Sequence, residues 1–499
     1  MKKLIYALPL VLALGACSNE ESVTAPVETE DSGIYLTLTA SLPGTRSTTG
    51  VDGASSDLTL EGTAAENELK KVSVFFFKEG TSATDLSNAL TGSVDFEGST
   101  QIVVGDGNVT LKKSISTDDL GKLVGEKLHI YVVGNPATIA SLSLTDPSAA
   151  SFTAANVGVN PFLAFNNGNT VGQTMPFVNH ADYTVDLKAI DNIYAVLKEV
   201  SGEQIFDISN GSGDYTTGGG VLSLERALAR IDFVPNAAGD KYDLTNDLDN
   251  HKLELTKLQL VNLYNGSTYL FRHTLEGTTA SAYGSSGKSI TLFGAEGAIS
   301  GGYNWVAGPE WNTGTSASNS SLTNKITKSS SGKTFEIVGT NDGIALSDLK
   351  VDGRKYDSSA AIYSLGYVLE NTIPTTELMN NTNRWEHATG IAFTFKVCDN
   401  SGNALTQNGN LRIRMQSGSY QDIEWNEDGY YLTYFGFIQH NGTSGAPMEY
   451  AIVRNNVYQL SIGTISTLPD PTQISTMYLQ LNVKVLPWVL RKNEFSWTE

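Results

Sequence analysis

The chain has 499 residues, of which 40% are hydrophobic and 17% are charged, and it contains 48 glycines. This length is ample for two all-β domains. The net charge of −20 argues against nucleic acid as a partner, because phosphate binding needs a basic surface.

The N-terminus has the features of a lipoprotein signal. Lys2 and Lys3 precede an apolar run at residues 4–14, which is too short to span a membrane. The next residues, "LGAC", resemble the lipobox of bacterial lipoproteins, in which a peptidase cuts before the cysteine and the thiol carries a diacylglyceryl group. We therefore expect residues 1–16 to be a signal peptide and Cys17 to be lipidated. The alternative is an ordinary signal peptide with a chance cysteine.

The first predicted strand, residues 34–42, follows a polar and acidic tether. Apolar and polar side chains alternate along it, which is the pattern of a strand that buries one face. A Pro-Gly turn then leads into a small, polar run in which Arg46 is the only basic residue between Lys3 and Lys70. A good strand is thus tethered through a segment that a protease can cut easily. The residues on its apolar face are Ile34, Leu36, Leu38, Ala40 and Leu42.

Short strands separated by turn residues continue to the end of the chain. Strands are predicted at 72–77 and 127–136, with a short helix at 116–127 that opens on a Ser/Thr-Asp cap. The Gly-rich run 208–220 is the expected domain boundary, and the run 221–235 is interpreted as strand rather than helix. The predicted fold class is all-β, with minor short helices, arranged as sandwiches. The later strands are expected at 253–263, 267–273, 289–293, 361–370, 390–398, 410–416, 429–439, 450–462 and 477–485.

The sequence offers no motif for catalysis or metal binding. The six histidines lack a ligand spacing such as H-E-x-x-H, and Cys398 has no partner once Cys17 is lipidated. Two Gly-Lys loops, at 283–289 and 329–334, lack the first glycine of a phosphate loop. The aromatic run 430–442 is interpreted as core in preference to a sugar-binding platform. We expect no catalytic residues, no metal and no cofactor, and hence a protein that is not an enzyme.

Four stretches together resemble one family. They are "ELKKVSVFFF", "LHIYVVGNP", "LERALARIDF" and "IVRNNVYQLSI", the last followed by "LQLNVKVLPWVLRKNEFSW". Their order is similar to that in the major fimbrial subunits (fimbrillins) of Bacteroidetes, the shaft proteins of type V pili. The most specific part is Arg454, Asn455, Asn456 and Tyr458, followed by Val485, Pro487 and Trp488. The resemblance covers nearly the whole chain except the middle, residues 275–350.

The resemblance implies a fold and an assembly route. The fold would be two consecutive transthyretin-like β-sandwich domains. The precursor would be a lipoprotein at the outer membrane, cut at the Arg46–Ser47 bond by a surface arginine-specific protease. Strand 34–42 would then leave, and its groove would accept the C-terminal segment of another subunit. The implied partners are identical subunits, other fimbrial components, and adhesion ligands on host or bacterial cells.

The same resemblance divides the chain. Residues 17–46 would be a propeptide, 47–218 and 219–486 the two domains, and 487–499 the donor segment. Pro487 is expected to interrupt the last ladder, which makes 477–485 the last strand of its own domain, although it is also the alternative donor. The expected donor side chains are Trp488, Val489, Leu490, Phe495 and Trp497.

Elementary physics supports a removable first strand independently. Burying a large aliphatic side chain stabilises a fold by roughly 1.5–3 kcal/mol. Loss of strand 34–42 would leave an apolar groove lined by unpaired backbone groups, which favours its replacement by a strand from a neighbour. Two other functions stay open from the sequence. One is an accessory pilus subunit, such as a tip adhesin, and the other is a surface glycan-binding lipoprotein.

Overall fold

The computed structural model describes both halves of the chain in a series of segments. These are residues 33–41, 60–61, 65–81, 86–105, 108–135, 175–187, 196–209, 216–218, 221–234, 240–244, 249–264, 269–277, 290–292, 297–299, 302–306, 322–328, 335–339, 343–348, 351–352, 362–371, 384–415, 418–440, 449–463, 465, 468 and 481–489. Strands dominate these segments, and the chain is all-β with minor short helices, as the sequence predicts.

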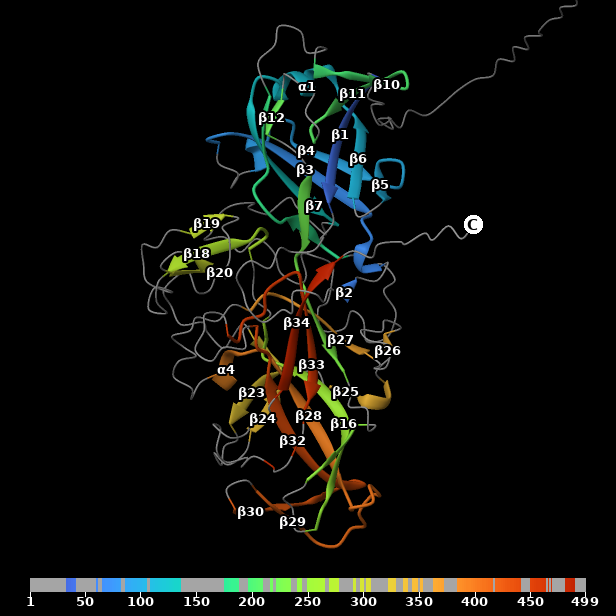
Figure 1. Ribbon diagram of the computed structural model, residues 1–499, viewed down its shortest axis with the longest axis vertical. Coiled ribbons are helices and arrows are strands. Elements are labelled where there is room, and N and C mark those ends of the chain that lie inside the picture. The colour runs from blue at the N-terminus through green and yellow to red at the C-terminus, as the bar shows by residue number, and fades with distance from the viewer. Residues whose placement is uncertain are drawn as a thin grey trace, which may run out of the picture.

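The N-terminal half is a sandwich of two strand layers, drawn in blue, cyan and green in Figure 1. One layer is β10 (Lys198–Val200), β11 (Glu203–Asp207), β1 (Ile34–Ser41), β6 (Asn108–Ser114) and β5 (Ile102–Gly105). The other is β4 (Ser93–Glu97), β3 (Lys71–Lys78), β7 (Lys127–Gly134), β8 (Phe177–Asn179), β9 (Thr184–Leu187) and β12 (Thr216–Gly218). Strand β13 (Leu222–Arg226) pairs with β1 through its first two residues and with β8 through its last three, and so joins the layers.

Hydrophobic patterning explains which faces this half buries. Strand β1 alternates between buried and half-buried residues, whereas β3 is buried along six consecutive positions because its "VSVFFF" run is covered on both faces. Helix α1 (Thr117–Leu123) begins where the Ser116 hydroxyl accepts a hydrogen bond from the Asp119 N–H, and it buries Leu120 and Leu123. The core therefore lies between the two layers, with α1 covering one end.

The C-terminal half contains a second pair of facing sheets, drawn largely in green and orange-red. The first has β14 (Ala229–Phe233) at its centre, antiparallel to β27 (Ile362–Val368) and parallel to β33 (Asn456–Ile462). It continues through β34 (Leu481–Val489) to β2 (Leu60–Glu61) and through β27 to β26 (Val351–Asp352). The second consists of β15 (Lys241–Asp243), β16 (Lys252–Val261), β28 (Gly390–Cys398), β32 (Gly429–Phe437) and β31 (Trp425–Asn426), with β25 (Ile344–Ala345) paired to β16.

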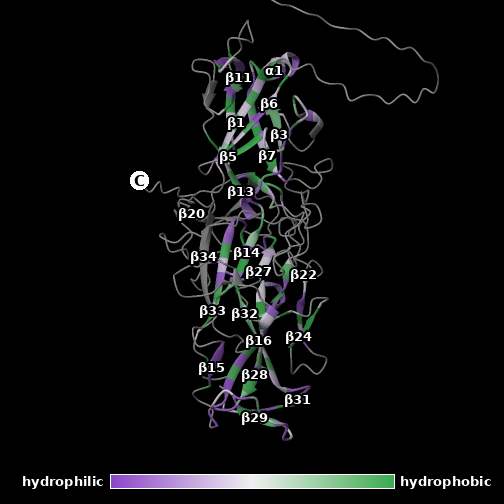
Figure 2. Cartoon of the chain, turned by 90° about the vertical axis from the view of Figure 1, so that its right-hand side faces the viewer, coloured by the Kyte–Doolittle hydropathy of each residue, from purple (hydrophilic) through white to green (hydrophobic). Residues whose placement is uncertain are grey.

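The C-terminal half also contains short strands and helices outside its two facing sheets. In Figure 2 apolar green and polar purple residues alternate along its long strands, as expected where one face is buried and the other meets water. The remaining strands are β17 (Leu263–Tyr264), β18 (His273–Gly277), β19 (Ile290–Leu292), β20 (Gly297–Ile299), β21 (Gly302–Val306), β22 (Leu322–Thr323), β23 (Lys325–Lys328), β24 (Phe335–Val338), β29 (Leu411–Arg414) and β30 (Tyr420–Ile423). The short helices of this half are η7 (Leu346–Asp348) and α4 (Arg384–His387), whereas η1 (Ala65–Asn67) and η2 (Leu86–Asn88) precede and follow β3 in the sequence.

The run 221–235 is extended, as predicted, but it forms two strands rather than one. Strand β13 belongs to the N-terminal sandwich and β14 to the C-terminal one, so the chain changes sheets at Ala227 and Leu228. The domain boundary expected at 218/219 lies before this change of sheets, because the Gly-rich run that suggested it precedes β13.

The last strand also differs from the expectation. Strand β34 does not end before Pro487 but runs to Val489, with Pro487 opposite Asn456 of β33. Among the described strands, β34 has a neighbour on only one side from Leu481 to Pro487. Proline is tolerated on such an edge because its missing N–H need not belong to the ladder.

Candidate functional site

The predicted removable strand is central to its sheet. Strand β1 pairs with β6 from Tyr35 to Ser41 on one side. On the other side it pairs with β11 from Ile34 to Thr37 and with β13 at Ala40 and Ser41. Taking β1 out would therefore expose the edge of β6 on one side and the edges of β11 and β13 on the other, with a groove between the two sides.

The apolar face of β1 is fully inserted into the core. Ile34, Leu36, Leu38 and Ala40 are at most 2% exposed. At roughly 1.5–3 kcal/mol for each large aliphatic side chain, the first three contribute about 5–9 kcal/mol. That is comparable to the whole stability of a typical domain, roughly 5–15 kcal/mol. Leu42, the fifth residue of the predicted face, lies outside the described residues.

The other predicted sites are only partly covered by the structure. Cys17, Arg46 and Ser47, and the donor residues Leu490, Phe495 and Trp497, lie outside the described residues. Trp488 and Val489 form the end of β34, where their backbones pair in parallel with Leu60 and Glu61 of β2. The start of the expected donor segment is thus paired to a strand that follows the expected cleavage bond.

Buried charges lie where the two sandwiches meet. Arg226, Arg230 and Arg454 are 0% exposed, and each has carboxylate or amide partners. The Arg230 Nη1 donates to Glu66 Oε1 at 2.9 Å, and its Nε donates to Asp232 Oδ1 at 2.7 Å. The Tyr367 hydroxyl also donates to Glu66. Glu66 of η1 thereby ties the segment after the N-terminus to two strands of the C-terminal half.

Arg226, at the end of β13, forms a second link. Its guanidinium donates to the Asn67 side chain and, at 3.4 Å, to the Glu66 carbonyl, and its backbone N–H donates to Asn455 Oδ1. It also lies over the Phe177 ring, 5.5 Å from the centroid. Burial lowers the pKa of Arg226 to about 10, although Glu66 opposes the change. The side chain is therefore cationic at neutral pH and held by its partners.

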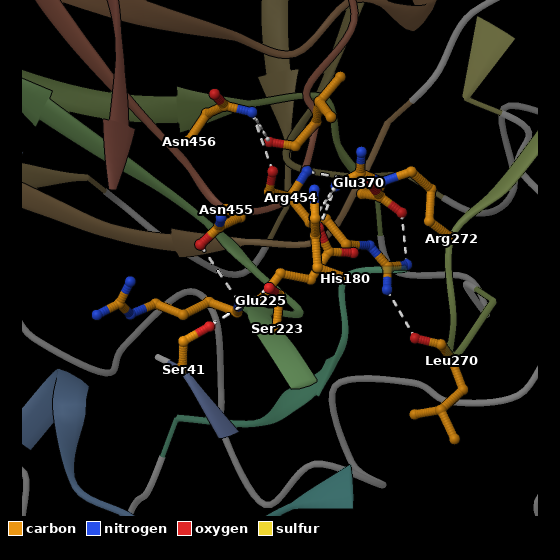
Figure 3. A network of polar contacts seen from close by, with 12 residues as sticks. Ser41, His180, Ser223, Glu225, Leu270, Arg272, Glu370, Arg454, Asn455 and Asn456 are labelled. Atoms are coloured by element: carbon orange, nitrogen blue, oxygen red, sulfur yellow. Dashed lines mark hydrogen bonds and ion pairs between the residues drawn. The ribbon is translucent and has the colours of Figure 1, made fainter. Parts of the chain in front are cut away.

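Figure 3 shows the third part of this network. Glu225, beside Arg226, accepts from Arg272 and lies 2.9 Å from His180 Nδ1. Burial alone would raise the pKa of Glu225, but Arg272 and His180 outweigh it and hold the pKa at about 2. Arg454 pairs with Glu370 at 2.5 Å and donates to the Leu270 carbonyl at 2.6 Å. These pairs fix segments that are far apart in sequence, and none of them brings a nucleophile together with a base.

The R-N-N-x-Y motif lies directly before and at the start of β33, and Figure 3 shows its first three residues. Asn455 has a positive φ of 59°, which asparagine tolerates better than most residues, and its N–H donates to the Leu228 carbonyl. Asn456 donates to the Arg454 carbonyl at 2.9 Å. The Tyr458 hydroxyl accepts from the Val453 N–H and lies 2.9 Å from His440 Nδ1. The motif is a turn that leads into β33 and docks Arg454 at the junction.

Some of these residues could be read from the sequence, and others could not. The motif residues and the polar face formed by Arg226, Arg230 and Asp232 stand out as charges inside apolar strands. Glu66 gives no such signal, because it precedes an ordinary polar run and its partners are at least 160 residues away. Only the fold brings them together.

No cluster of histidine, cysteine and carboxylate side chains that could hold a metal occurs among the described residues. None of the described helices is long and apolar enough to cross a membrane. Cys398 is buried beside Glu254, and burial raises its thiol pKa to about 11. The aromatic run also lies in the core as interpreted, with Tyr430 and Tyr434 at 2% and 1% exposure.

Comparison with known proteins finds a family match in the C-terminal region of the chain. Residues 427–494 match the family described as "Major fimbrial subunit protein type IV, Fimbrillin, C-terminal". No curated protein matches the chain.

Solved structures give a weaker likeness. A protein of Parabacteroides distasonis described as a candidate cell adhesion protein is 13% identical, with 92% of this chain and 98% of that chain covered at a TM-score of 0.41. The tip fimbrial protein Mfa3 of Porphyromonas gingivalis, with a C-terminal truncation, is 12% identical, with 91% and 99% covered at 0.36. A fimbrilin of the same species is 16% identical, with 91% and 98% covered at 0.35. Because these scores lie below 0.5, the assignment depends on the family match over residues 427–494. That match supports the resemblance drawn from the sequence: the C-terminal region of this chain is similar to the C-terminal part of major fimbrial subunit proteins.

Proposed function

We propose that this protein is a structural subunit of a cell-surface fimbria that polymerises by donor-strand exchange. The observation that carries the proposal is the position of β1. It is paired with β6 on one side and with β11 and β13 on the other, and its apolar face is inserted into the core, yet it is joined to the strands that follow it through the segment that contains Arg46.

Cleavage would change how β1 is held. In the uncut chain the tether keeps β1 at a high effective concentration beside its groove. After a cut at Arg46–Ser47, rebinding becomes bimolecular and must overcome an association cost of roughly 4–15 kcal/mol. The roughly 5–9 kcal/mol from its aliphatic side chains falls within that range, so the cut strand can leave. A strand from another subunit then restores the core and joins the two subunits.

We assign the donor to residues 487–499, with 477–485 as the alternative. In the uncut chain the first donor residues, Trp488 and Val489, pair with β2. Donation therefore includes the opening of this short parallel pair. Since β2 follows the cleavage bond, it stays with the subunit after the cut and remains available to the tail until a neighbour accepts it.

The precursor would reach the outer membrane as a lipoprotein through Cys17 and lose its lipid with residues 17–46. Its partners would be identical subunits, other fimbrial components, an arginine-specific surface protease, and adhesion ligands on host or bacterial cells. The comparison with fimbrillins supports a fimbrial role and a surface location.

One observation favours an accessory role, such as a tip adhesin. Strands β18 to β21 form a separate small sheet beside the main sandwiches, in the region that the family resemblance does not cover. Immunogold labelling of filaments separates the two functions, since a shaft subunit is labelled along the whole filament and a tip subunit only at its end.

The cleavage step is tested by substitution. Arg46→Ala and Arg46→Lys should both leave a lipidated, uncut monomer, because lysine keeps the charge but is not a substrate for an arginine-specific protease. Thr45→Ala is the matched control and should be cut and assembled normally. Normal filaments from either Arg46 variant would contradict the proposed trigger.

A further inference from the structure

The wall of the β1 groove has a gap that a side chain fills. On the side away from β6, strand β11 ends at Asp207, opposite Thr37, and β13 begins to pair only at Ala40. The backbone of β1 between these points has no strand partner on this side among the described residues. Ile208 extends β11 by donating its N–H to the Thr37 carbonyl at 3.0 Å, and the gap then falls at Thr39.

Ser209 occupies this gap. Its hydroxyl oxygen accepts a hydrogen bond from the Thr39 N–H and lies 3.4 Å from the Thr39 carbonyl oxygen, to which it can donate. The side chain therefore serves both backbone groups of Thr39, as a strand residue would. Ser209 is only 2% exposed, so water cannot replace it easily.

The hydroxyl is held in place by its surroundings. The Ser209 N–H donates to Asp207 Oδ1 at 3.0 Å, which closes a tight turn at the end of β11. The Tyr183 side chain, itself 7% exposed, forms a hydrogen bond with Ser209 from the facing layer. The position of the hydroxyl thus depends on residues that stay in the subunit after cleavage.

We propose that Ser209 is a main-chain-binding residue of the acceptor groove. Its hydroxyl fills the gap between β11 and β13 and accepts a hydrogen bond from a backbone N–H of whichever strand occupies the groove. This inference rests on the proposed function and adds a requirement to it. The occupying strand must present an N–H at the position of Thr39, so proline is excluded there. Because this hydrogen bond is made to the backbone, β1 and a donor strand of different sequence can both form it.

The test uses the full chain, cut after Arg46, and a synthetic peptide of residues 33–42. One version of the peptide carries an ester in place of the Thr39 amide, which removes the N–H without adding bulk. The ester should bind the cut wild-type chain about tenfold more weakly than the amide peptide, the loss expected for one hydrogen bond of roughly 1.4 kcal/mol. On the Ser209→Ala chain the two peptides should bind alike, and Ser209→Thr should restore the difference.

Ser223→Ala is the matched control. Ser223 also borders β1 and contacts the Ser41 hydroxyl at 3.3 Å, but it is exposed, so its variant should keep the tenfold difference. An equal ester effect on wild-type and Ser209→Ala chains would overturn the proposed role of Ser209. Failure of both peptides to bind the cut wild-type chain would overturn strand exchange itself.

A second readout needs no cleavage. In the uncut chain, Ser209→Ala should speed hydrogen exchange at the Thr39 amide by about tenfold and leave Leu38, which faces β6, unchanged. Unchanged exchange at Thr39 would overturn the contact even if strand exchange occurs.

Discussion

Replacement of Leu36 by alanine should lower the stability of the precursor but not that of the filament. Leu36 is 0% exposed and stands in register between Phe206 of β11 and Lys113 of β6. A Leu→Ala change at such a site removes apolar burial and leaves a cavity, which costs roughly 2–5 kcal/mol. In the filament β1 has been replaced, so the same substitution is absent from the assembled subunit.

Two assays measure the two states. Denaturant unfolding of the full chain should show the N-terminal transition lowered by about 2–5 kcal/mol for Leu36→Ala. After cleavage, release of the β1 peptide should be faster by about 30- to 5,000-fold if the whole change appears in the dissociation rate. Filaments assembled from the variant should resist denaturant as the wild type does.

Thr37→Ala is the control, because Thr37 is only partly buried and points away from the core. Surface changes of this kind usually shift stability by no more than about 0.5 kcal/mol. If filaments of Leu36→Ala subunits are weakened as much as the precursor, β1 stays in the assembled subunit and strand exchange is contradicted.

Three further predictions follow from the same structure. Glu225→Gln should cost roughly 3–5 kcal/mol, because it leaves Arg272 buried without its charged partner, and urea unfolding at neutral pH measures this. Because the pKa of Glu225 is depressed to about 2 in the folded chain, its contribution should be present above about pH 4.5 and lost as pH falls towards 2, so acid unfolding of wild type and Glu225→Gln should converge there. With Cys17 replaced by serine, the folded chain should not react with a thiol reagent at pH 8, because Cys398 is buried and its thiol pKa is raised to about 11; rapid labelling before denaturation would contradict this. Deletion of residues 490–499 keeps β34 and its pairing with β2, so monomer stability should hold while polymerisation fails, and normal filaments from this chain would move the donor to 477–485.

The sequence predicts the parts of the fold that depend on local pattern. The alternation in "IYLTLTAS" places β1 correctly, and the apolar run of "KVSVFFFK" places β3, because periodicity decides which faces are buried. The serine cap predicts the start of α1, because a serine hydroxyl can accept a hydrogen bond from an N–H of the first helical turn. These signals act within a few residues and need no knowledge of the partners.

The pairing of strands that are far apart in the sequence cannot be predicted from such local patterns. The continuous run "VLSLERALARIDFVP" does not reveal that Arg226 and Ala229 belong to different sheets, because the change occurs without a glycine or proline between them. The partner of Pro487 is equally invisible, since its tolerance depends on an edge position in the sheet. Ser209 carries no sequence signal at all, because its role comes from a gap between two strands that both pair with β1.

The N-terminus of the assembled subunit shows whether β1 is cut off and lost when the filament forms. Filaments sheared from the cell surface should be dissociated, and the subunit analysed by N-terminal sequencing and intact mass. We expect a chain that begins at Ser47, without lipid and without the residues of β1. A filament subunit that retains residues 34–41 in covalent connection with the rest of the chain would contradict it.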